Sequence, residues 1–270
     1  MKHIQSIQDF AKLVRILSLQ SIHLAGSGHP GGSLDAAEVF AAIYYARSKE
    51  KIEVVLSAGH LAPAWYASLY LTGEVTRHQM RSLRKLGSKL QGHPERGTLP
   101  SILNTSGPLG QGASFGVGRA LGTKKTVLVI TSDGEHQEGQ TWEAIMSAAQ
   151  FGCSNLVFLV LHNNMQIDGH VTNIMNVESL AEKYAAFHWE VQSVEGNKPL
   201  LVQKKLQKLI TSQSKKPRVL ICHTLAGKGV SFMENNPLWH GKSLSDKELQ
   251  CALGELSAQK MKENYPGVLL

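Results

Sequence analysis

Three short apolar runs constrain the fold of this chain more than any other feature of its sequence. They cover Lys125–Thr131, Asn155–Leu161 and Pro217–His223, and each is rich in valine, leucine or isoleucine. Continuous apolar runs of this length are typical of parallel strands that are covered on both faces. Helix-like patterns separate the runs. This alternation predicts an α/β fold with a doubly wound, mostly parallel sheet flanked by helices.

The helical patterns are amphipathic and fall between and before these runs. The expected helices span Ile4–Leu24, Leu34–Ala46, Trp142–Phe151, Ser179–Phe187 and Leu200–Leu209. Asp35 and Glu38 would lie in the first turns of the second helix, where the helix dipole favours acids. The pattern contains no internal repeat and no low-complexity linker, so one domain is expected over residues 1–270.

Three segments of this domain stand apart from the alternating core. Residues 1–30 are expected to form an N-terminal helix and turn. Residues 224–270 are interpreted as a C-terminal extension that packs on the domain or on a partner. Gly87–Gly112 holds six glycines and three prolines and is interpreted as a long functional loop.

Composition and charge exclude several classes of protein. The net charge is +7, and the densest basic group, Lys198–Arg218, has the spacing of a solvated helix face. Aromatic residues do not alternate with the basic ones, so nucleic-acid binding is not expected. No apolar run is long enough for a membrane span, and three cysteines without close pairing do not indicate a disulfide framework. We therefore expect a soluble, reduced, cytoplasmic protein.

Polar residues that follow two of the predicted strands carry the strongest functional signal. Asp133 and Asn163 are 30 residues apart and each follows a strand, so both should lie at the carboxyl edge of the sheet. Their oxygens suit Mg²⁺, and Gly134 would let a phosphate approach the backbone. Taken singly, Asp-Gly and Asn-Asn are also ordinary turn sequences. Together, after two buried strands, they predict a metal and phosphate site.

These residues resemble a known signature. Asp133-Gly134 followed by Asn163-Asn164 is similar to the thiamine diphosphate signature. Further segments occur in the same order as in transketolases: Ser27-Gly28-His29-Pro30-Gly31-Gly32, Gly59-His60, Gly92-His93-Pro94-Glu95 and Gly107-Pro108-Leu109-Gly110-Gln111-Gly112. The resemblance extends from about Ser27 to Gly241. It implies the thiamine diphosphate-binding fold of the diphosphate-binding (PP) domain, encoded as the separate N-terminal subunit of a split transketolase.

The resemblance implies a role for each matching residue at the metal and diphosphate. Asp133 and Asn163 would ligate Mg²⁺ through their side chains, with Ca²⁺ or Mn²⁺ as possible substitutes, and Met165 through its carbonyl oxygen. Gly134 would offer its amide to the diphosphate. His60 is similar to a histidine that touches the diphosphate.

Other matching residues would surround the reacting part of the cofactor. His29 and His93 resemble histidines that hydrogen-bond sugar hydroxyls and move protons, which suits side chains that titrate near neutrality. Gly107 and Leu109 resemble the loop that holds the aminopyrimidine ring. His240 lies in a Trp-His-Gly segment similar to one near the diphosphate.

The chain lacks the pyrimidine-binding (PYR) domain that follows this region in full-length transketolases. Glu138 resembles an acid that joins neighbouring active sites, and it completes a catalytic set with His29, His60 and His93. We therefore expect a PYR-domain partner subunit in an α₂β₂ heterotetramer. The implied reaction transfers a two-carbon ketol unit from a ketose to an aldose, as sugar phosphates or related sugars.

Two alternatives stay open at this point. One is half of another thiamine diphosphate enzyme, similar to deoxyxylulose-phosphate synthase or to the α subunit of a 2-oxo-acid dehydrogenase. The other is a non-catalytic regulatory binding subunit, because Ser132 replaces the first glycine of Gly-Asp-Gly. A serine would be strained there if that position required a positive φ. The sequence does not identify the sugars.

Overall fold

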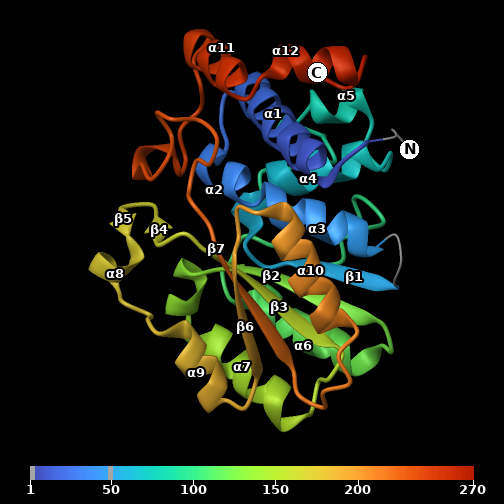
Figure 1. Ribbon diagram of the computed structural model, residues 1–270, viewed down its shortest axis with the longest axis vertical. Coiled ribbons are helices and arrows are strands. Elements are labelled where there is room, and N and C mark those ends of the chain that lie inside the picture. Colours follow the sequence, from blue (N-terminus) through green and yellow to red (C-terminus); the bar gives the residue numbers. More distant parts are fainter. Residues whose placement is uncertain (1–3, 48–50) are drawn as a thin grey trace.

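The computed structural model describes residues 4–47 and 51–270 and is built on a parallel sheet of five strands. The strand order is β1-β2-β3-β7-β6, and every neighbouring pair is parallel (Figure 1). The strands are β1 (Ile52–Leu56), β2 (Thr126–Ser132), β3 (Leu156–His162), β7 (Arg218–His223) and β6 (Glu190–Glu195). The predicted α/β fold with helices on both faces of a parallel sheet is confirmed.

Alternate side chains of the strands enter two separate hydrophobic cores. In β2, Leu128 and Ile130 belong to one core, whereas Val127 and Val129 belong to the other. The first core includes residues of α1 (Ile7–Ala25), α3 (Ala37–Arg47), α4 (Ala62–Leu71) and α10 (Pro199–Ile210). The second includes residues of α6 (Gln111–Gly122), α7 (Gly139–Gln150) and α9 (Leu180–Ala186). Burial on both faces explains why the central strands are continuously apolar.

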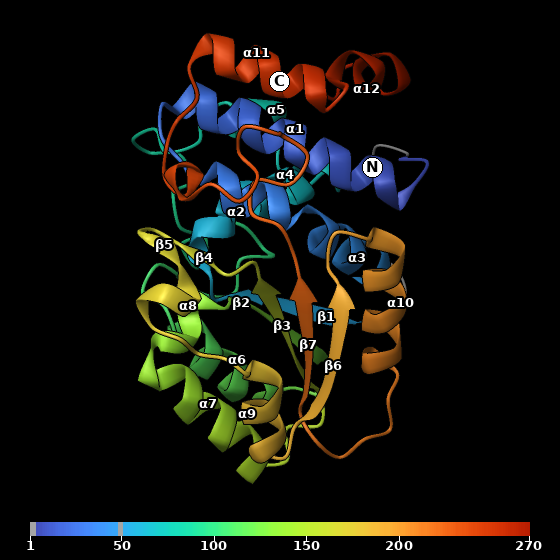
Figure 2. The same cartoon turned by 60° about the vertical axis from the view of Figure 1, so that its left-hand side comes forward.

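Short elements connect and extend these layers. They are α2 (Pro30–Asp35), η1 (Gly59–Leu61), α5 (Arg77–Met80), η2 (Gly134–Gln137), β4 (Met165–Gln166), β5 (Gly169–His170), α8 (Val171–Ile174), η3 (Pro237–Trp239), α11 (Asp246–Glu255) and α12 (Ala258–Asn264). The helices α11 and α12 lie across α1 (Figure 2), and the Tyr265 hydroxyl donates to Asp9 Oδ2 at 2.7 Å. None of the described helices is long and apolar enough to cross a membrane.

The structure corrects the prediction for the second helix. The chain forms two helices here, because α2 ends at Asp35 and α3 begins at Ala37. Asp35 is the last residue of α2, whereas Glu38 lies in the first turn of α3 as expected, and both side chains are buried. Glu38 forms an ion pair with Arg15, whose Nη2 donates to both carboxylate oxygens at 2.6 and 2.7 Å. Buried carboxylates need such partners, because their desolvation outweighs the helix-dipole term.

Close packing of α6 places the Gly107–Gly110 segment over the carboxyl edge of the sheet. A Cβ on Gly112 would lie 2.5 Å from Ser57 Cα, and one on Gly116 would lie 2.3 Å from Val129 Cγ2. Only glycine permits this approach of the helix to β1 and β2. Ser57 after β1 and Glu135 after β2 therefore meet this segment at that edge.

Candidate functional site

Asp133 and Asn163 follow β2 and β3 and lie together at the carboxyl edge of the sheet. Asp133 is 1% exposed and accepts hydrogen bonds from the backbone N–H of Gly134 at 2.8 Å and of Asn164 at 2.5 Å. Asn163 Oδ1 accepts from the backbone N–H of Met165 at 2.8 Å. Burial raises the pKa of Asp133 to about 6. The strand-end geometry predicted for this pair is present.

Asp35 is a neighbour of this pair that the sequence analysis assigned elsewhere. Its side chain is fully buried, and Oδ2 accepts from Asn163 Nδ2 at 2.5 Å and from Thr224 Oγ1 at 3.2 Å. Oδ1 has no hydrogen-bond partner among the described residues. Burial raises the pKa of Asp35 to about 8, and the nearby charge of Asp133 also raises it. The sequence does contain one sign that Asp35 is buried, because this acid lies within an apolar stretch, between Leu34 and the pair Ala36-Ala37.

This edge has the chemistry of a cation site. Asp35 and Asp133 are buried carboxyl groups, and neither forms an ion pair with lysine or arginine within the described part of the chain. An unpaired carboxylate in such a place is costly unless a cation binds. Carboxylate, amide and backbone carbonyl oxygens are ligands that Mg²⁺ accepts. The donor set therefore fits the divalent cation that the sequence predicted.

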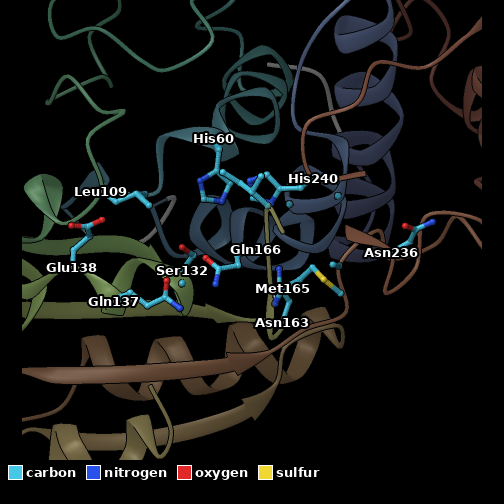
Figure 3. Close-up of a pocket in the computed structure, with 15 residues that line it drawn as sticks. His60, Leu109, Ser132, Gln137, Glu138, Asn163, Met165, Gln166, Asn236 and His240 are labelled. Carbon is cyan, nitrogen blue, oxygen red and sulfur yellow. Dashed lines mark hydrogen bonds between the residues drawn. The ribbon is translucent and has the colours of Figure 1, made fainter. Parts of the chain in front are cut away.

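A cavity of about 180 Å³ opens beside these residues. Its lining unites residues predicted from separate segments: His60, Leu109, Gly134, Glu138, Asn163, Met165 and His240. His60 and His240 lie on one side of the cavity, opposite Ser132 and Gln137 (Figure 3). Glu138 is exposed beside Leu109 at one end. The buried Asp133 is not part of the lining.

Four histidines form a cluster next to this cavity. The ring centroids of His29 lie 5.9 Å from His60, 5.8 Å from His93 and 5.6 Å from His240. Burial lowers the pKa of all four, to about 3 for His29 and well below the ordinary value for His60. In this structure the rings are therefore neutral at pH 7. They can donate and accept hydrogen bonds, which differs from the near-neutral titration expected from sequence.

Glu135 connects the loop before α6 with the turn after β2. Its carboxylate accepts from Ser57 Oγ at 2.5 Å, from the Gly110 N–H at 2.7 Å and from the Ser132 N–H at 3.4 Å. Burial raises the pKa of Glu135 to about 7. Glu135 was not predictable as a site residue, because an acid after Asp-Gly is typical of a solvated helix start.

The backbone also resolves the question about Ser132. Non-glycine residues with positive φ among those described are Arg84, Asn164, His188, Asn235 and Ser257. Ser132 is not one of them, so a side chain at this position introduces no strain. By contrast, Gly107 and Gly110 have φ of 139° and 83°, where glycine is favoured.

Comparison with known proteins identifies the family. The family "Transketolase, thiamine diphosphate binding domain" matches residues 6–263. A curated relative from Clostridium sp. (strain MSTE9), the 6-deoxy-6-sulfo-D-fructose transketolase subunit SqwG, is 35% identical over 267 residues. The match covers 94% of this chain and 97% of the relative. An apulose-4-phosphate transketolase subunit of Phocaeicola vulgatus is 32% identical, with coverage of 94% and 93%.

Solved structures agree with this result. The transketolase of Campylobacter jejuni superposes with a TM-score of 0.88 at 27% identity, and the match covers 99% of this chain. The chain spans 46% of that protein and 42% of the similar Leishmania mexicana transketolase. It therefore corresponds to one part of these longer enzymes and to nearly the whole of the two separate subunits. The chain belongs to the transketolase thiamine diphosphate-binding domain family and is an N-terminal subunit of the split type.

Proposed function

We propose that this chain is the cofactor-anchoring subunit of a heteromeric transketolase. It acts with a PYR-domain partner in an α₂β₂ assembly, and it binds thiamine diphosphate together with Mg²⁺. The reaction moves a two-carbon ketol unit from a ketose to an aldose. The two curated relatives are named for different sugars, so the proposal stops at sugar phosphates or related sugars.

The observation that carries the proposal is the group of buried acids next to the histidine-lined cavity. Asp133, Asn163 and the carbonyl of Met165 would hold the metal. Gly134 lines the cavity without a side chain, which leaves room for a diphosphate near its backbone. In this structure the Gly134 N–H donates to Asp133, and a bound diphosphate would compete for it. Leu109 and Gly107 would contact the cofactor ring.

The bound cofactor would supply the carbanion chemistry that breaks and forms the carbon–carbon bond. The histidines of this chain would position the sugar around it. His29, His60 and His93 are neutral and only partly buried, so each can donate a hydrogen bond to a sugar oxygen and accept one from a hydroxyl. A neutral imidazole can also take up a proton during the reaction.

The partner requirement rests on two observations. Two relatives that it matches over more than nine-tenths of their own length are themselves named as transketolase subunits. Glu138 is exposed at the rim of the cavity, and a partner subunit would cover it there. The match to a transketolase family over residues 6–263 favours this enzyme over the two other thiamine enzymes considered from sequence.

The proposal is tested by purifying the chain in complex with its native companion and assaying ketol transfer with thiamine diphosphate and Mg²⁺. We expect activity in the complex, and loss of activity when Asp133→Ala removes a metal ligand. The exposed Asp246 on α11 provides a matched control, since Asp246→Ala should keep full activity. A complex that retains no cofactor and transfers no ketol unit would favour the regulatory role instead.

A further inference from the structure

Arg84 reaches the histidine cluster from the long segment between α5 and α6. Its guanidinium Nη1 donates to Ser27 Oγ at 3.2 Å, and Nη2 lies 3.3 Å from His29 Nδ1. Neither Arg84 nor this contact was a candidate in the sequence analysis. The contact joins a charged side chain directly to one of the proposed catalytic histidines.

The backbone around Arg84 is shaped to hold this guanidinium. Arg84 has a φ of 61°, which non-glycine residues rarely adopt, and its N–H donates to the Leu90 carbonyl at 2.8 Å. A Cβ on Gly92 would lie 2.8 Å from Arg84 Cζ, so any larger residue would displace the side chain. Two independent backbone features therefore favour the same placement. An unusual φ of this kind is a reason to look for function.

The contact determines where the proton of His29 resides. A guanidinium only donates hydrogen bonds, so Nδ1 must be the accepting nitrogen. A neutral imidazole with an accepting Nδ1 carries its proton on Nε2. Among the described residues no hydrogen bond involves His29 Nε2, and the rings of His60, His93 and His240 surround the His29 ring.

We propose that Arg84 is a positioning residue that holds His29 in the Nε2–H tautomer. His29 then offers a hydrogen-bond donor to a ligand oxygen in the active site. Its role toward a sugar rests on the proposed function, whereas the tautomer itself does not. Arg84 acts through His29 and is not assigned a contact with substrate.

The tautomer is measured directly by ¹⁵N NMR of the full chain labelled at histidine nitrogens. The His29 signals are assigned from their absence in His29→Gln. In the wild type we expect the protonated nitrogen to be Nε2. In Arg84→Met, and separately in Gly92→Ala, we expect a mixture of the two tautomers. An unchanged Nε2–H signal in a folded variant of either kind would overturn the proposal.

Gly92→Ala leaves the arginine in the sequence and only displaces it, so it covers the case in which Arg84→Met does not fold. Arg84→Lys retains a donor and should recover part of the Nε2–H population. Lys85→Met removes an exposed neighbouring cation and should leave the His29 signals unchanged. A shift of the His29 signals in Lys85→Met as large as that in Arg84→Met would mean that general charge is responsible, which would also overturn the proposal.

Activity of the assembled complex gives a second readout. We expect Arg84→Met to lower kcat about 10- to 100-fold, less than the roughly 10²- to 10⁴-fold contribution of a whole acid–base group because His29 itself is retained, with little change in the KM for thiamine diphosphate. A changed KM with an unchanged kcat would contradict the positioning role. If the wild-type complex transfers no ketol unit, the proposed function fails, while the NMR result still decides the tautomer.

Discussion

The two ends of the same parallel sheet differ in whether their charged side chains have partners of opposite charge. At the carboxyl edge, Asp35, Asp133 and Glu135 are buried and form no ion pair with a cation among the described residues. At the amino edge, Glu53 in β1 is paired with Arg119 at 2.5 Å and with Lys125 at 2.9 Å. The carboxyl edge thus has acids that accept hydrogen bonds but lack a cationic partner, whereas Glu53 at the amino edge is neutralised by two cations.

A buried arginine at the amino edge also differs from the buried acids at the carboxyl edge. Arg218 begins β7 and is 2% exposed. Its terminal nitrogens donate to the carbonyls of Leu209, Ser212 and Ser154. Leu209 lies at the carboxyl end of α10, where the helix dipole stabilises a cation. Three carbonyls therefore stabilise this charge within the protein, as expected for a residue that serves stability, although Nε has no hydrogen-bond partner among the described residues.

We infer that the charged residues of the carboxyl edge serve ligand binding and those of the amino edge serve stability. Changes at the carboxyl edge should weaken ligand binding with little loss of stability. Changes at the amino edge should do the reverse. Single substitutions at either edge can break this separation.

The largest effect is expected from Asp133→Ala at the carboxyl edge. The change removes a carboxylate that would ligate the metal, so the affinity for thiamine diphosphate with Mg²⁺ should fall more than about 100-fold. This exceeds the roughly 10- to 100-fold loss that is typical when a residue that only orients a metal ligand is removed. Titration calorimetry of the assembled complex measures this affinity. An affinity within a few-fold of the wild type would remove Asp133 from the metal site.

Asp35→Asn should weaken Mg²⁺ binding about 10- to 100-fold, because Asp35 orients Asn163 from outside the ligand set. The same change removes a buried carboxyl group with one unpaired oxygen, so the metal-free protein should become more stable by about 1–2 kcal/mol. Chemical denaturation without metal measures this. A loss of stability would show that Asp35 is a structural residue.

At the amino edge, Arg218→Met should lower stability by about 2–3 kcal/mol. The reason is that several buried carbonyls lose their donor at once. Cofactor affinity in the folded complex should stay within a factor of two. Weaker binding in this variant would mean that the two edges are coupled.

The smallest effect is expected from Glu53→Gln. This change should lower the free energy of unfolding by about 1 kcal/mol or less, because Arg119 and Lys125 are partly exposed. Hydrogen bonds from Arg119, and then from Lys125, lower the pKa of Glu53 to about 2. The stabilisation is therefore fully present above about pH 4.5 and is lost as the pH falls towards 2. Unfolding curves of both proteins should differ at pH 7 and converge near pH 2. A constant difference would exclude the ion pairs as its cause.

The central strands were predictable because burial on both faces makes them continuously apolar. The runs ending at Thr131, Leu161 and His223 match β2, β3 and β7 to within a residue at either end. Two strands of the five-stranded sheet were missed. In β6, which lies at the sheet edge, only Val191 and Val194 are apolar, and in β1 the acid Glu53 interrupts the run.

The candidate site was predictable only where its residues follow strands or recur in ordered segments. Asp133 and Asn163 belong to the first kind, and His60 to the second. Asp35, Glu135 and Arg84 were not found, because their importance depends on what the fold places next to them. In the sequence alone, such residues look like a helix-start acid or a surface cation. Only the tertiary structure shows that they are withdrawn from water.

The most direct test of the account is the effect of thiamine diphosphate and Mg²⁺ on the unfolding temperature of the assembled complex. Wild type, Asp133→Ala and Arg218→Met are compared with and without both ligands. We predict that wild type and Arg218→Met gain the same stabilisation from the ligands, although Arg218→Met starts lower, and that Asp133→Ala gains none. Equal stabilisation of Asp133→Ala and wild type would contradict the assignment of the carboxyl-edge acids to the cofactor site.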